Sequence, residues 1–131
     1  MSEPFIHLCV HSDLSLVDGV VRIKKLVAGV RDRMMPAVGL TEQGNLFSLV
    51  KFYRSAMGAG IKPIIGADVM LAGDDDGAAL TRLTLLCQTD AGYQNLSVLL
   101  SEGYRIGQID GRPTLSRSLM EVRSQGLIVF A

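Results

Sequence analysis

The sequence has no tryptophan, only two cysteines, and aromatic residues at 5% of its 131 positions. It also lacks an excess of charge, because 13 Lys and Arg are balanced by 13 Asp and Glu. Proteins that bind nucleic acid by themselves usually carry a strong excess of basic residues, so the balanced charge argues against an autonomous nucleic-acid-binding protein. Any contact with DNA would then be local or supplied by other chain segments.

Long hydrophobic runs are missing as well. Charged residues or glycines interrupt every apolar stretch well short of the roughly 20 residues that a bilayer-spanning helix needs, and the start "MSEPF" is not typical of a signal peptide. We therefore expect a cytoplasmic protein without a membrane segment. Cys9 and Cys87 both lie in apolar, strand-like runs, which favours reduced, buried thiols over a disulfide.

The residues that are present are typical of one globular domain, with 48% hydrophobic and 20% charged residues. Strand-like and helical periodicities alternate along the chain. Strands are expected at 5–11, 35–41, 62–71, 80–88 and 126–130, with the third and fourth paired as a hairpin across a solvated turn at 72–78. Helices are expected from 20 to 34, from 45 to about 58, from about 90 to 104, and within 115–124, with 106–113 as a loop. This order predicts an α/β fold built from parallel βα units.

Each predicted helix has an apolar stripe at three- and four-residue spacing. Asp18 is placed to cap the first helix and Asn45 to cap the second, since both side chains can accept from free N–H groups. The predicted buried positions are Val20, Ile23, Val27, Val30 and Met34 in the first helix, Leu46, Leu49, Val50, Tyr53 and Met57 in the second, and Leu96, Leu99, Leu100 and Tyr104 in the third.

Polar residues gather where the predicted strands end. Side chains alternate along a strand, so His7, Cys9 and His11 share one face of the first strand. The second strand ends in Thr41, Glu42 and Gln43, and Asp68 lies late in the third. Sites of α/β proteins occur at the carboxyl ends of parallel strands, so this clustering favours a pocket there.

Four stretches, "FIHLCVHSDLSLVDG", "AVGLTEQGNLFSLVKFY", "GIKPIIGADVML" and "AGYQNLSVLLSEGY", resemble the amino-terminal PHP (polymerase and histidinol phosphatase) domains of bacterial DNA polymerase III alpha subunits. The resemblance implies a distorted (β/α)7 TIM-like barrel with a multinuclear metal site at its strand ends in metal-binding members. Family barrels are longer than this chain. Residues 1–131 are therefore expected to form the first half of such a barrel, an N-terminal portion incomplete at its C-terminus.

The resemblance also implies which residues stand at the family's metal positions. The opening His-x-His matches Cys9 and His11, with His7 as a flanking neighbour. The family pattern Thr-Asp-His-Gly-Asn reads Thr-Glu-Gln-Gly-Asn here, so that Glu42 keeps a carboxylate while Gln43 replaces an imidazole.

Two further family positions have changed. Asp68 stands where the family has Glu, and Arg82 stands where it usually has His. Asp18 is either a helix cap or a further metal-site position.

By donor chemistry, Cys9, His11, Glu42 and Asp68 could supply zinc with four ligands. Arg82 only donates hydrogen bonds and stays protonated, so it would repel a cation. We therefore predict a vestigial pocket without a cofactor, in which Glu42 and Arg82 form an ion pair. Residual or structural zinc or manganese is the alternative. Cys9 and His7 are further interpreted as buried core residues, His7 satisfied by a backbone carbonyl.

The resemblance implies a part in DNA replication. The parent protein would be a DNA-directed DNA polymerase (a nucleotidyltransferase), and this fragment alone would be an inactive scaffold that supports the polymerase core and docks the proofreading exonuclease subunit. DNA would be met only through the full-length holoenzyme. The alternative is a residual metal-dependent PHP phosphoesterase or proofreading nuclease, marked by chelator-sensitive activity that zinc or manganese restores. The isolated fragment is also expected to self-associate, because its last strand exposes an apolar edge.

Overall fold

The computed structural model describes residues 4–73 and 79–131, and the predicted turn at 72–78 falls largely outside them. The described residues form a mixed six-stranded sheet with helices. Within these residues, none of the helices combines the length and apolarity that crossing a membrane requires. The elements are η1 (Asp13–Ser15), α1 (Ile23–Asp32), β1 (Ala37–Gln43), α2 (Leu49–Gly58), β2 (Lys62–Leu71), β3 (Thr81–Cys87), α3 (Asp90–Ile106), β4 (Gln108–Ile109), β5 (Arg112–Leu115), α4 (Arg117–Val122) and β6 (Leu127–Phe130).

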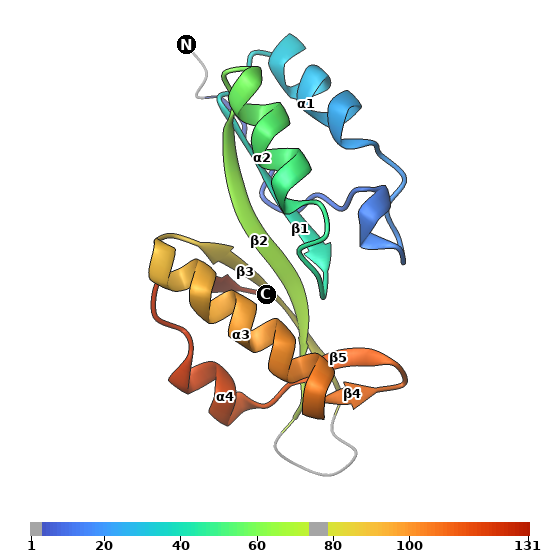
Figure 1. The fold of residues 1–131 in the computed structure, drawn as a ribbon, viewed down its shortest axis with the longest axis vertical. Coiled ribbons are helices and arrows are strands. Elements are labelled where there is room, and N and C mark those ends of the chain that lie inside the picture. The colour runs from blue at the N-terminus through green and yellow to red at the C-terminus, as the bar shows by residue number, and fades with distance from the viewer. Residues whose placement is uncertain (1–3, 74–78) are drawn as a thin grey trace.

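The long strand β2 is the centre of the sheet and runs through the whole molecule (Figure 1). Strand β1 pairs with it in parallel along one edge, and β5 continues on that edge at Met70 and Leu71. Strand β3 pairs with the other edge as the predicted antiparallel hairpin, and β6 pairs antiparallel with β3. The expected succession of parallel βα units therefore holds for β1, β2 and β5, whereas β3 reverses direction.

Two hydrophobic clusters lie on the same face of the sheet. In the N-terminal cluster, residues of α1 and α2 pack on Val38 and Leu40 of β1. In the C-terminal cluster, Leu96, Leu99 and Leu100 of α3 and Met120 of α4 pack against residues of β2, β3 and β5. The register aligns Leu40 with Ile65 and Glu42 with Ala67, so the strand residues of the two hydrophobic clusters point to the same face of the sheet. The helices thus cover this face of the sheet, and the strand residues that alternate with the cluster residues point to the opposite face.

The first and third helices keep most of their predicted cores, although Tyr104 of α3 is 42% exposed and its predicted burial is wrong. Ile23, Val27 and Val30 are buried in α1, as are Leu96, Leu99 and Leu100 in α3. The first helix is shorter than predicted, because Val20 precedes it and Met34, at φ 56°, adopts a left-handed conformation after its end. Both of these side chains are almost fully exposed, so the prediction that they are buried is wrong.

The predicted apolar face of the second helix is wrong at three of its five positions, while Leu46 and Leu49 are partly buried. Phe52 and Ala56 are the buried residues of α2, whereas Val50, Tyr53 and Met57 are exposed. The helix begins at Leu49, after a turn in which Asn45 Oδ1 accepts from the Phe47 N–H at 3.1 Å. Asn45 therefore stabilises the turn before the helix and is not its N-cap, which is Ser48.

Two other segments differ from prediction. Residues 5–11 follow β1 through single hydrogen bonds, such as Gly39 N–H to the His7 carbonyl at 2.7 Å, and form one isolated bridge in place of a regular strand. The expected loop at 106–113 contains the β4–β5 hairpin, whose turn places Asp110 and Gly111 at φ 51° and 74°. Positive φ values are typical of tight hairpin turns, and an aspartate followed by glycine is a common solution.

Candidate functional site

The segment after His11 folds back across the ends of β1 and β2. The Ser12 side chain accepts from the Leu14 N–H at 3.1 Å and starts the short helix η1. Gly19 then passes so close that a Cβ placed there would lie 1.8 Å from the Ser12 carbonyl oxygen. Only glycine permits this approach. The return of the chain brings Asp18 beside His11.

The first buried carboxylate of the site is Asp68 on β2, which is 1% exposed. Its Oδ2 lies 2.6 Å from Nε2 of His11 and also accepts from the Arg82 guanidinium, while Oδ1 accepts from the Thr84 hydroxyl at 2.6 Å. In the hairpin register Thr84 faces Asp68 and Arg82 faces Met70, so all three side chains lie on one side of the sheet. We call Asp68 with these three partners the Asp68 cluster.

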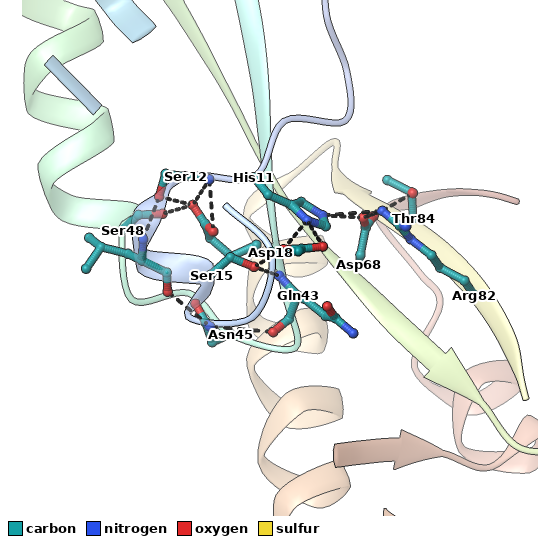
Figure 2. Close-up of polar contacts among 12 residues, drawn as sticks. His11, Ser12, Ser15, Asp18, Gln43, Asn45, Ser48, Asp68, Arg82 and Thr84 are labelled. Carbon is teal, nitrogen blue, oxygen red and sulfur yellow. Dashed lines mark hydrogen bonds and ion pairs between the residues drawn. The ribbon is translucent and has the colours of Figure 1, made fainter. Parts of the chain in front are cut away.

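His11 joins two carboxylates (Figure 2). Its Nδ1 lies 2.8 Å from both oxygens of Asp18, and its Nε2 faces Asp68. Because an ionised carboxylate can only accept, this arrangement is satisfied when both ring nitrogens donate, which is the imidazolium form. In that form, His11 and the Arg82 guanidinium both donate to Asp68, and His11 also donates to Asp18, which lies beside the cluster.

The electrostatics of Asp18 and Arg82 agree with this pairing. Partial burial opposes the charged form of Asp18, but hydrogen bonds from His11 and Ser15 and the charges of His11 and Arg82 outweigh it and hold the pKa of Asp18 below its usual 3.8. The hydrogen bond to Asp68 raises the pKa of Arg82 above its ordinary value, against the effect of burial. Both groups are therefore ionised at neutral pH.

The second buried carboxylate is Glu42 on β1, also 1% exposed. The Ser12 N–H donates to its two oxygens at 3.1 and 3.2 Å, and the hydroxyls of Ser12 and Ser48 both donate to Oε1, the latter at 3.2 Å. Among the described residues, no Lys, Arg or His forms an ion pair with Glu42. We call Glu42 with these two serines the Glu42 cluster.

The two clusters lie on opposite faces of the sheet. Glu42 is in register with Ala67 on the helix-covered face, whereas Gln43 is in register with Asp68 on the other face. The predicted ion pair between Glu42 and Arg82 is therefore wrong, because Arg82 pairs with Asp68 instead. Because Glu42 and Asp68 lie on opposite faces, the four zinc ligands considered from the sequence, Cys9, His11, Glu42 and Asp68, do not come together.

The remaining predicted positions divide between the cluster and the surface. Cys9 is exposed, not buried, with its Sγ 3.6 Å from Thr84 Oγ1. His7 is also exposed, and its ring packs edge-on against Phe5 with centroids 4.8 Å apart, so it is not a core residue. Asp18 does not cap α1, whose N-cap is Arg22.

Gln43 and Asp68 help to line a small cavity of about 130 Å³ between η1 and the β4–β5 hairpin. The Gln43 backbone N–H is held by the Ser15 hydroxyl at 3.0 Å. Ser15, Ser48 and Thr84 also belong to this hydrogen-bond network, and the sequence did not single them out. Thr84 could have been found from its place two residues after Arg82, on the same face of the predicted hairpin.

The donor set does not fit the multinuclear metal site of the family resemblance. Across residues 4–73 and 79–131, no three His, Cys, Asp or Glu side chains come together as a metal-holding group. A cation at Asp68 would have to displace the Arg82 guanidinium, and both nitrogens of His11 already face carboxylates. Glu42, on the other face, has its oxygens filled by N–H and O–H donors.

A family model described as PHP domain matches residues 7–131. The chain belongs to the PHP domain family. It is 47% identical over 131 residues to DNA polymerase III subunit alpha of Pseudomonas aeruginosa, and 44% identical over 132 residues to that of Escherichia coli K12. Each match covers 100% of this chain and 11% of the relative, so the chain spans a small part of the proteins it matches, corresponding to their N-terminal region.

Solved structures give the same fold at lower sequence identity. An amidohydrolase from Chromobacterium violaceum, with bound sulfate and no metal, has a TM-score of 0.60 at 20% identity and covers 76% of this chain and 33% of its own. A protein from Bifidobacterium adolescentis, assigned as a metal-dependent phosphoesterase, has a TM-score of 0.60 at 14% identity, covering 79% and 35%. The α/β class and the likeness to part of a barrel are confirmed, while the (β/α)7 count stays a prediction.

Proposed function

We propose that this chain is the amino-terminal PHP portion of a replicative DNA polymerase alpha subunit, and that its polar centre is a structural network in place of a hydrolytic metal centre. The identity to polymerase alpha subunits along the whole chain supports the first part. The observation that carries the second part is the Arg82 guanidinium on Asp68, in the position that a cation would need.

In this role the network ties together segments that are distant in sequence. The Asp68 cluster links the segment after residue 10 to β2 and β3, through His11, Arg82 and Thr84. The Glu42 cluster links that same segment to β1 and to the start of α2, through Ser12 and Ser48. His11 and Ser12, which are adjacent in the chain, thus contact carboxylates on opposite faces of the sheet. Such a network favours one arrangement of the strand ends, which suits a domain that supports others.

The same geometry disfavours hydrolysis. Multinuclear phosphoester hydrolysis needs ligands that bridge cations and an open position for an activated water. His11 would have to give up Asp18 or Asp68 to become a ligand, and Gln43 supplies a neutral amide where the family resemblance implies imidazole. No hydrolytic step is therefore assigned to these residues.

The partners proposed for the chain are the remainder of the polymerase alpha subunit and the proofreading exonuclease subunit. The first is supported by the 11% of the relatives' length that the chain covers. The second follows from the resemblance to polymerase PHP domains. DNA synthesis belongs to the whole protein in this proposal, and the chain meets DNA only within it.

Metal content tests the proposal on the full-length gene product. Elemental analysis is expected to give less than one equivalent of tightly bound metal per chain, and phosphoester hydrolysis is expected to be absent and not induced by zinc or manganese. Two or three metals per chain, or an activity that a chelator removes and zinc or manganese restores, would instead establish a residual PHP phosphoesterase or nuclease.

A gain-of-ligand variant sharpens this test. Cys9→His, Gln43→His and Arg82→His together return imidazole to one face of the sheet, where Asp68 also lies, and are expected to raise zinc affinity measurably. The matched control is Arg82→Ala alone, which removes the competing cation without adding a ligand. Equal zinc affinity in the triple variant and this control would show that the geometry of the pocket has been lost as well as its ligands.

A further inference from the structure

Positive charge is concentrated in about one third of this electrically balanced chain. Residues 20–62 contain eight of the 13 Lys and Arg but two of the 13 Asp and Glu, Asp32 and Glu42. Glu42 is buried, and Asp32 lies 3.4 Å from Arg31. The surface formed by α1 and α2, which lie side by side (Figure 1), is therefore strongly basic although the chain as a whole is neutral.

An open hollow of about 570 Å³ lies on this surface. Phe47 and Val50 supply its apolar part and are 63% and 59% exposed. Three cations surround them, one from α1 and two from α2. The full lining is Lys24, Phe47, Val50, Lys51, Arg54 and Ser55. We call this feature the α1–α2 hollow, and none of its six side chains belongs to the Asp68 or Glu42 cluster.

The cations of the hollow are available for a partner. Within the described part of the chain, Lys24, Lys51 and Arg54 have no carboxylate within ion-pair distance. By contrast, Arg82, Arg105 and Arg117, which lie outside residues 20–62, each pair with an acidic side chain. An exposed aromatic ring beside unpaired cations is typical of a protein-binding surface, with an apolar centre and a charged rim.

We propose that the α1–α2 hollow docks an acidic amphipathic helical segment of a partner protein. Its apolar side chains would pack on Phe47 and Val50, and its carboxylates would meet Lys24, Lys51 and Arg54. Helices that dock in this way place their anchors at three- and four-residue spacing, and complementary charge speeds and orients the encounter. The backbone of a nucleic acid would satisfy the cations but would leave Phe47 and Val50 without apolar contact, so a protein segment is favoured.

The inference goes beyond the proposed function and does not depend on whether the polar centre holds metal. Its test uses the full-length gene product and three fluorescein-labelled probes. The first is a helical peptide with Leu and Phe on one face and Glu on the flanks, the second is a peptide of the same composition in scrambled order, and the third is a single-stranded oligothymidylate. Fluorescence anisotropy at physiological salt measures their affinities.

The helical peptide is expected to bind about ten-fold or more tightly than either other probe. Two variants are expected to bind the helical peptide about ten-fold more weakly: the double variant Lys51→Glu with Arg54→Glu, and the single variant Phe47→Ser. All three side chains are at the surface, so the variants should fold, and circular dichroism can verify this. Lys62→Glu is the control, because Lys62 is an exposed cation of the same basic segment, residues 20–62, but does not line the hollow.

No binding of the helical peptide would overturn the proposal. Equal loss of affinity in Lys62→Glu and in the Lys51, Arg54 double variant would also overturn the proposal, because it would show that the peptide binds by non-specific charge attraction. Equal or tighter binding of oligothymidylate would assign the surface to nucleic acid instead.

Discussion

Glu42 and Asp68 are two carboxylates on neighbouring strands, each 1% exposed, and they are stabilised in different ways. Glu42 receives hydrogen bonds from a backbone N–H and serine hydroxyls, all neutral groups. Asp68 receives them from Arg82, His11 and a threonine hydroxyl. The difference follows from the face of the sheet: Glu42 points toward the helices, and Asp68 points away from them.

The comparison shows two ways of satisfying a buried carboxyl group, by neutral donors alone or with the help of a cationic side chain. Hydrogen bonds to a charged group contribute about 1.5 to 3 kcal/mol each, so several neutral donors can offset much of the cost of removing a carboxylate from water. An ion pair adds Coulomb energy but also buries a second charge. At Asp68 that second cost is small because Arg82 keeps 58% of its side chain exposed.

The largest effect is expected at Asp68. Asp68→Ala removes the buried carboxylate that His11, Arg82 and Thr84 contact, so the free energy of unfolding should fall by about 3 kcal/mol. Urea denaturation measures it. Asp68→Asn is the matched control, because it keeps the shape and one acceptor. A change below about 1 kcal/mol in the alanine variant would show that the cluster is not a structural link.

A smaller loss is expected at Glu42. Glu42→Ala leaves the Ser12 N–H and the hydroxyls of Ser12 and Ser48 without their acceptor, at a cost of about 2 kcal/mol in urea unfolding. Ser48→Ala, which removes one neutral donor, should cost about 1 kcal/mol. If Glu42→Gln proved as harmful as Glu42→Ala, charge would matter more at this position than the number of hydrogen bonds.

A still smaller effect is expected at Arg82. Its side chain is more exposed than buried, so Arg82→Ala should lower the free energy of unfolding by about 1 kcal/mol or less. Added salt should shrink this difference, whereas the loss in Glu42→Ala should be insensitive to salt. Equal salt dependence in the two variants would contradict the distinction between an ionic and a neutral cluster.

The smallest effect concerns pH and Asp18. Because the pKa of Asp18 is lowered in the folded state, its contribution is present above about 3.8 and is lost as pH falls through the folded pKa. Wild type should therefore exceed Asp18→Asn in stability near neutral pH, and the two should converge as the solution is acidified below about pH 3.8. Thermal unfolding across this range measures the gap, and a constant gap would show that His11 and Ser15 do not stabilise the Asp18 carboxylate.

Much of the fold was predictable because several elements have strong local signals. The hairpin of β2 and β3 follows from strand-like runs on either side of a turn, and β1 follows from a short apolar run. The helix α3 follows from helical spacing and has a clear cap in Thr89. The face of α2 was not predictable in this way. Its start depends on the turn at Asn45, and a shift of the start by a few residues changes which side chains point inward.

Several residues of the polar centre were singled out from the sequence, but their pairing was not predicted correctly. The resemblance to PHP domains singled out His11, Asp68 and Arg82, which do come together. The error over Glu42 came from treating neighbours in sequence as neighbours in space, although Glu42 and Gln43 must point to opposite faces of a strand. The contribution of Ser12 and Ser48 depends on chain segments that only the folded structure brings together.

Arg82 has a consequence for how this domain responds to its surroundings. A bound ion stabilises a folded protein by mass action, to an extent that varies with the free concentration of the ion. The positive charge that Arg82 places on Asp68 is part of the polypeptide, so its effective concentration is set by the chain and cannot be diluted or chelated. If the polar centre is the structural network proposed above, the strand ends that meet at Asp68 should be held in the same way in a metal-starved cell and in a metal-replete one.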